Sequence, residues 1–166
     1  KREGDGKTPA GLFWVSAVFG KDPEYKEQCK MPFIHVGPTT EAIDDPKSRY
    51  YNQIVSADLA GEKDWTSSEK MYEISSYNVG VFINHNSPVQ DPAAGSCIFI
   101  HEWRAPHKPT AGCVALATNN LKELAEWLDI KKKPTIVMLP MKEYRSHMLR
   151  WSLHRMPFDE YLAPTD

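Results

Sequence analysis

The residues of this chain that are best suited to catalysis lie between Cys97 and Leu116, in the stretch CIFIHEWRAPHKPTAGCVAL. The stretch begins with a short apolar run, which predicts a buried strand from Cys97 to Glu102. Because side chains alternate along a strand, Cys97, Phe99 and His101 should share one face of it. The strand therefore presents a histidine close to its end.

A cysteine follows this histidine after a short loop. The loop from Ala105 to Thr110 contains two prolines and is predicted to be irregular, and Gly112 then precedes Cys113. Eleven residues separate His101 from Cys113. A thiol becomes a nucleophile when an imidazole lies within hydrogen-bond reach, and a loop that folds back on its own strand would bring the two together. This spacing indicates a cysteine nucleophile with a histidine base.

Zinc binding is a second interpretation of the same stretch. Four of its side chains carry suitable donor atoms, although their spacing C-x3-H-x5-H-x5-C matches none of the common structural-zinc patterns. The four residues are Cys97, His101, His107 and Cys113.

Three segments, in order along the chain, resemble the L,D-transpeptidase catalytic domains of the YkuD-type family. The segment from Gly95 to Leu116 is similar to the active-site stretch of the branch that reads His, a proline-containing loop and Pro-Thr-Ala-Gly-Cys. REGDGKTPAGLFWV (Arg2 to Val15) and DDPKSRYYNQIV (Asp44 to Val55) are similar to two earlier motifs. The resemblance covers most of residues 2 to 140.

The resemblance implies a mainly-β or α+β fold, a single-domain, β-sandwich-like catalytic unit over residues 1–140 with a few peripheral helices. It implies Cys113 as nucleophile and His101 as base. Backbone N–H groups of Gly112 and Cys113 would hold the oxyanion, for which a residue without Cβ at position 112 allows close approach. No cofactor or metal is expected.

The implied substrate is the tetrapeptide stem of peptidoglycan, cleaved between diaminopimelate and D-Ala. Cys113, as thiolate, would form a thioester, which an amine of a neighbouring stem or of a protein lysine would resolve. Two alternatives remain open: hydrolysis of the same thioester by an L,D-carboxypeptidase, and a murein-binding module without activity. We also expect acylation of Cys113 by a carbapenem, and an exported protein of the periplasm or cell envelope.

The chain departs from the wider family in the groups that orient substrate. The family usually has a histidine before the Gly-Cys pair and often an arginine two residues after the cysteine, and here these positions hold Ala111 and Ala115. Arg104, on the loop between base and nucleophile, is the candidate replacement for carboxylate binding. Further candidates for substrate contacts are Thr110, Arg49 and Asn52. For the loop from Asp44 to Asn52 we favour a turn role over a wall of the substrate groove.

Composition excludes several other classes of protein. The chain has 166 residues, 41% of them hydrophobic and 25% charged, which is ordinary for one globular domain. Its formal net charge of −2 and the lack of a basic stripe give no reason to expect nucleic acid as a partner. No apolar run is long enough for a membrane span. Its three cysteines permit one disulfide, and we expect Cys29 and Cys97 not to pair.

The remaining pattern predicts the elements that must position the site. A capping box at residues 66–69 predicts a helix start, and apolar residues at i, i+3, i+4 and i+7 predict a helix over residues 119–129 with Thr118 as its cap. We expect residues 141–166 to form a helical extension, with a helix over 141–155 that ends before Pro157 and packs on the same domain. The strands expected besides 97–102 are Leu12 to Val15, Met31 to Val36, Tyr77 to Asn84 and Thr135 to Leu139.

Overall fold

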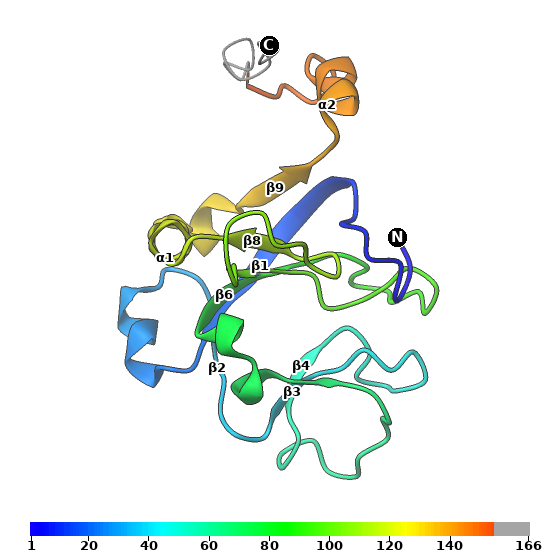
Figure 1. The fold of residues 1–166 in the computed structure, drawn as a ribbon, viewed down its shortest axis with the longest axis vertical. Helices are drawn as coiled ribbons and strands as arrows, with labels where there is room; N and C mark the ends of the chain where they lie inside the picture. The colour runs from blue at the N-terminus through cyan, green and yellow to red at the C-terminus, as the bar shows by residue number, and fades with distance from the viewer. Residues whose placement is uncertain (155–166) are drawn as a thin grey trace.

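Residues 1–154 are described in the computed structural model, in which two β-sheets lie one above the other with short helices around them (Figure 1). The larger sheet has the order β2-β1-β6-β7-β8, and β9 pairs with the first half of β1. Its strands are β1 (Gly11–Gly20), β2 (Phe33–His35), β6 (Val79–Ile83), β7 (Phe99–Glu102), β8 (Val114–Leu116) and β9 (Thr135–Met138). The predicted mainly-β or α+β class is confirmed.

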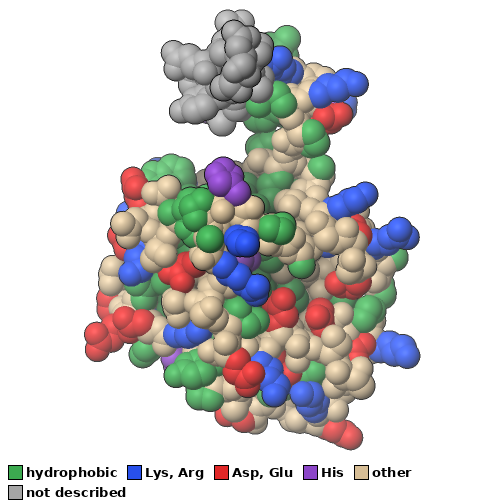
Figure 2. Space-filling model, in the orientation of Figure 1, with side chains coloured by type: hydrophobic (Ala, Val, Ile, Leu, Met, Phe, Trp, Pro, Cys, Tyr) green, Lys and Arg blue, Asp and Glu red, His purple; other side chains and the backbone are tan. Residues whose placement is uncertain are grey.

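The smaller sheet has three strands in the order β4-β3-β5. They are β3 (Thr40–Ala42), β4 (Ile54–Ser56) and β5 (Glu69–Lys70), and all of their pairings are antiparallel. The helices are α1 (Thr118–Trp127) and α2 (Met141–His147), with short 3₁₀ helices at Pro23–Gln28, Met71–Glu73, Ser75–Tyr77 and Ile130–Lys132. Figure 2 shows charged side chains of both signs spread over the outside of these elements.

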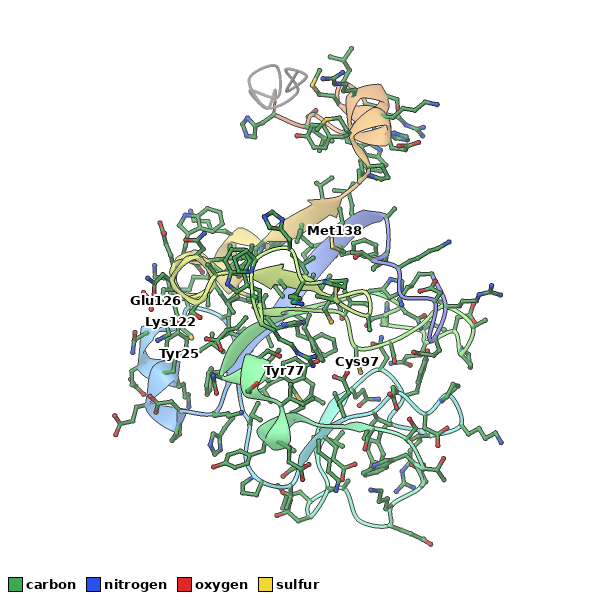
Figure 3. All side chains as sticks on the ribbon, viewed as in Figure 1. Tyr25, Tyr77, Cys97, Lys122, Glu126 and Met138 are labelled. Atoms are coloured by element: carbon green, nitrogen blue, oxygen red, sulfur yellow. The ribbon has the colours of Figure 1, made fainter. Side chains whose placement is uncertain are left out.

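The alternation predicted along β7 separates two hydrophobic clusters. Phe99 is fully buried between the sheets, in a cluster with Phe19 of β1, Met71 and Tyr77. Ile100 points to the opposite face, where α1 packs its own apolar stripe. One face of the large sheet thus packs against the small sheet, and α1 covers the opposite face. Figure 3 shows Tyr77 and Cys97 in the layer between the two sheets.

The helix predicted after β8 is confirmed as α1, with one difference at its start. Leu121 and Ala125 are fully buried, as the i, i+4 pattern requires. The N-cap is Ala117, without a side-chain cap, and not Thr118. The Tyr25 hydroxyl fixes the helix from outside by donating to the Lys122 carbonyl at 3.3 Å or to the Glu126 carboxylate at 3.2 Å (Figure 3).

Strand β1 is longer than the predicted Leu12 to Val15. Its first half pairs with β9, and its second half lies between β2 and β6, with a register shift between Val15 and Ala17. Because the second half has a partner on each side, the strand continues to Gly20. The other predicted strands are present and slightly shorter than expected.

The helix start predicted at residues 66–69 is wrong. The Thr66 N–H and hydroxyl both donate to the Asp45 carboxylate at 2.8 Å, and the Ser68 hydroxyl bonds to Glu41. Glu69 then continues as a strand and pairs with Ala42. The hydroxyl groups therefore bind acidic side chains far away in sequence, and none of them caps a helix.

The C-terminal part of the described chain lies apart from the sheets. Helix α2 follows β9 and stands beyond its end (Figure 1), and none of the residues in α2 is buried. The helix predicted over residues 141–155 is shorter than expected, because it ends at His147 with Met148 as its C-cap. Arg155 and Pro157 lie outside the described residues, and the packing of the whole 141–166 segment on the domain stays a prediction. No helix of residues 1–154 is long and apolar enough to cross a membrane.

Candidate active site

A pocket of about 290 Å³ opens where the loop before β8 faces the small sheet. The pocket is lined by both candidate catalytic residues of the sequence motif, His101 and Cys113. The other lining residues are Glu69, Ile74, Ser76, Tyr77, Trp103, Arg104, Lys108, Pro109, Thr110, Ala111 and Ala115.

Strand register places His101 and Cys113 on the same face of the large sheet. Strands β7 and β8 are parallel, with His101 opposite Ala115 and Ile100 opposite Val114. Cys113 precedes β8 by one residue and so lies beside Phe99, whose N–H donates to its sulfur at 3.4 Å. His101 and Cys113 are therefore one strand apart and offset by two residues along the strand direction, which separates their α-carbons by about 8 Å. Their side chains are long enough to meet across this distance.

A backbone carbonyl orients the imidazole of His101. Nδ1 lies 2.8 Å from the carbonyl oxygen of Glu102, and because a carbonyl only accepts, Nδ1 must carry the proton. Nε2 of the neutral ring is then left as an acceptor. The edge-to-face packing of Tyr77 against the ring, with centroids 5.4 Å apart, further fixes the imidazole. The Glu102 carboxylate accepts a hydrogen bond from Asn78, which leaves the orienting role to the carbonyl.

The surroundings of Cys113 and His101 shift the pKa values of both side chains. Burial raises the pKa of Cys113 to about 11, and the negative charge of Glu69 acts in the same direction, while the Phe99 N–H and Lys1 oppose it. Burial lowers the pKa of His101. These shifts favour the neutral forms of both groups, a thiol and an imidazole, when no substrate is bound. Consistently, the sulfur lies 3.6 Å from the Cys97 carbonyl oxygen, to which a thiol can donate.

The turn before Cys113 is held by Thr110 and by the N-terminal segment. The Thr110 hydroxyl donates to the Cys113 carbonyl at 2.6 Å and accepts from the Gly112 N–H at 3.3 Å. Gly112 has φ +135°, and a Cβ there would lie 2.8 Å from the Lys7 carbonyl oxygen and 3.2 Å from Lys1 Nζ. Glycine is thus required because the N-terminal segment packs directly against this turn.

Of the four predicted substrate contacts, two line the pocket and two do not. Arg104 and Thr110 line it. The Arg49 guanidinium instead donates to the Glu62 carbonyl and pairs with Asp64, on the outside of the 44–52 loop. Asn52 is buried with φ +62°, and its amide bonds the backbone of three other residues. The turn role favoured for this loop agrees with these contacts.

Sequence reasoning missed three charged residues of the site, Glu69, Lys108 and Lys1. Glu69 comes from the small sheet, and its only sequence signal, a capping box, pointed to a helix. Lys108 lies on the predicted loop and could have been noted there. The Lys1 ammonium is paired with Asp5 at 2.9 Å and lies against Gly112, a contact that only the fold reveals.

The structure does not assemble the alternative zinc site. Within residues 1–154, no group of three or more His, Cys, Asp or Glu side chains could hold a metal ion. Cys97 is buried between the sheets, whereas His107 is exposed and does not line the pocket. Cys29, Cys97 and Cys113 are all free thiols.

Two sheets with a cysteine and a histidine lining one pocket are the arrangement expected of a cysteine acyltransferase or hydrolase built on a β-rich fold. The model of the YkuD family, the L,D-transpeptidase catalytic domain, matches residues 1–137. The chain therefore belongs to this family, whose members act on peptidoglycan and are typically associated with the cell envelope. Comparisons with curated proteins and with solved structures gave no match.

Proposed function

We propose that this protein is a peptidoglycan L,D-transpeptidase that uses Cys113 as nucleophile and His101 as base. The observation that carries the proposal is the placement of both side chains on one face of the β7–β8 pair, lining one pocket. The catalytic domain in this proposal spans residues 1–140, and the segment that follows is an appendage to it. Export to the periplasm or cell envelope is part of the proposal, because the substrate is found there.

The first half-reaction forms a thioester. Nε2 of His101 takes the thiol proton as Sγ of Cys113 attacks the carbonyl that follows the L-centre of diaminopimelate. Because the resting pair is neutral, this proton moves during the attack and not before it. The S–C bond forms, the C–N bond to D-Ala breaks, and the imidazolium returns its proton to the leaving amine.

The second half-reaction transfers the acyl group. An amine of a neighbouring stem or of a protein lysine attacks the thioester, His101 takes a proton from that amine, and the S–C bond breaks. His101 then returns the proton to the sulfur, which restores the thiol. Water in place of the amine would give the carboxypeptidase reaction at the same site.

Backbone donors before β8 can hold the oxyanion. The Gly112 N–H makes only a long bond, 3.3 Å, to the Thr110 hydroxyl, and an anionic oxygen would be a stronger acceptor. The Cys113 N–H and the nearby Lys1 ammonium would also stabilise the negative charge of the oxyanion. Arg104 and Lys108 are placed to bind a carboxylate of the stem.

The test uses defined tetrapeptide stems and purified tetrapeptide-rich murein. The wild-type protein should release D-Ala, show a transient acyl adduct by intact-mass measurement, and give cross-linked muropeptides; tripeptides alone would indicate hydrolysis. Cys113→Ala should lose all of these activities, by roughly a thousandfold or more, while Cys29→Ala keeps them. A carbapenem should add once to the wild type and not to Cys113→Ala. Murein binding without turnover by the wild type would favour a binding module and refute the enzyme.

A further inference from the structure

Glu69 is an acidic residue that lines the pocket, and the proposed mechanism assigns it no role. It lies on β5 opposite Ala42, a fully buried residue of the cluster between the sheets, so that its side chain points to the larger sheet. It lines the same pocket as Cys113. Its carboxylate accepts a hydrogen bond from the Tyr77 hydroxyl, at 2.7 Å. No lysine or arginine within residues 1–154 forms an ion pair with it.

The environment of Glu69 disfavours a carboxylate without a cation. Burial raises its pKa, the hydrogen bond from Tyr77 opposes this rise, and the charges of Asp44 and Glu3 add to it, so that the pKa is raised overall. A carboxylate in such a place costs free energy that an arriving cation would recover. The Tyr77 hydroxyl can satisfy one of the acceptor sites of the carboxylate, which leaves others for a ligand.

The pocket is lined by opposite charges that come from two different parts of the fold. Arg104 and Lys108 lie on the loop that connects β7 to Cys113, and the charge of Arg104 acts on His101. Glu69 lies on the small sheet, and its charge acts on Cys113. A ligand group that carries both a carboxylate and an ammonium would match this arrangement, since each of its charges meets the opposite sign.

We propose that Glu69 binds the side-chain ammonium group of a diamino acid in the donor stem, while Arg104 and Lys108 face the carboxylate of the same zwitterionic centre. The inference rests on the proposed function, because it assumes that the donor stem occupies this pocket. An acceptor amine is a poorer occupant, since a carboxylate that binds an ammonium holds its proton and slows its attack. Glu69 is thus a specificity residue that selects a diamino acid next to the scissile bond.

The test compares three synthetic donor tetrapeptides that differ at the third residue: meso-diaminopimelate, lysine and norleucine. Release of D-Ala is measured in a single turnover, with enzyme in excess over stem and no added amine acceptor, so that it reports acylation by the donor alone. Glu69→Gln should lower kcat/KM by about 10- to 100-fold more for the two stems with a side-chain ammonium than for the norleucine stem, on which only the charge effect on Cys113 acts. Glu73→Gln is the matched control, because this exposed glutamate pairs with Lys70 and does not line the pocket.

The other outcomes would overturn the proposal. An equal loss on all three stems would assign Glu69 a positioning role through Tyr77 and His101, and a loss that appears only when an amine acceptor is added would assign it to the acceptor. Thiol alkylation of Cys113 and the melting temperature show whether Glu69→Gln is folded; if it is not, Glu69→Asp, which keeps the charge, must discriminate the stems as the wild type does. If the wild type releases D-Ala from none of the stems, it is the proposed function that fails.

Discussion

The side-chain oxygen of Asn52 accepts the backbone N–H of Cys97 at 2.9 Å, across 45 residues of sequence. The amide nitrogen of the same side chain donates to the carbonyls of His85 and Asn86 at 2.8 and 2.9 Å. One buried amide therefore ties the 44–52 loop to the chain that leads into β7.

Replacing Asn52 should damage stability and not substrate affinity. Asn52→Ala leaves a buried N–H and two carbonyls without partners at a residue with φ +62°, and should lower the free energy of unfolding by about 3 kcal/mol. Arg49→Ala, on the exposed side of the same loop, should stay within about 0.5 kcal/mol. Urea denaturation measures both. A KM for the donor stem that rises in Arg49→Ala would instead support a contact between Arg49 and the substrate.

The pH dependence of Cys113 alkylation reports the state of the resting pair. Because the pKa of Cys113 is raised to about 11, the thiolate fraction at pH 7 is small and increases about tenfold per pH unit up to that value. The rate of iodoacetamide reaction should therefore climb steadily from pH 7 to pH 10. The measurement uses Cys29→Ala, in which Cys97 is buried and Cys113 is the accessible thiol. A rate that is flat between pH 6 and 8 would show a preformed thiolate–imidazolium pair.

The Thr110 hydroxyl should matter for catalysis through the shape of the turn. Thr110→Val removes the bonds to the Cys113 carbonyl and the Gly112 N–H, at a cost of about 1–2 kcal/mol in stability, and should lower kcat about tenfold. Thr110→Ser keeps the hydroxyl and should retain the wild-type kcat. Equal losses in both variants would mean that the methyl group of Thr110, and not its hydroxyl, supports the turn.

Gly112 tests the contact between the turn and the N-terminal segment. Gly112→Ala places a Cβ 2.8 Å from the Lys7 carbonyl oxygen, so backbone must move, and we expect a loss of roughly 2–4 kcal/mol. Gly61→Ala is the matched control, because it also has a positive φ, +76°, but nothing lies within 4 Å of its Cβ. It should lose only about 1 kcal/mol. Similar losses in the two variants would mean that backbone strain alone explains the effect.

Local sequence patterns predicted the parts of the fold that depend on local physics. The period of two along Cys97 to Glu102 placed Phe99 and His101 on one face, and the period of 3.6 placed Leu121 and Ala125 against the sheet. The same residues lie there in the structure. The fold class followed from the resemblance and from the many short strands.

The parts that sequence could not predict depend on contacts between distant segments. Residues 66–69, with Thr66 and Glu69 at the ends, match a capping box. In the structure the hydroxyl groups of Thr66 and Ser68 instead donate to Asp45 and Glu41, which come close only when the small sheet forms. Glu69 reaches the pocket from that second sheet, and no spacing from Cys113 signals it. The neutral state of the thiol was also hidden, because burial is a property of the folded chain.

Cys113, the proposed nucleophile, also packs against the cluster that joins the two sheets, together with Phe99 and Tyr77. Small changes in this shared interior should therefore shift the sulfur of Cys113 directly. Heat should abolish turnover and tertiary structure in one transition, since this architecture provides no folded intermediate in which the small sheet has separated and the cysteine still works. Melting curves from activity and from near-ultraviolet circular dichroism that coincide would show that turnover and tertiary structure are lost together.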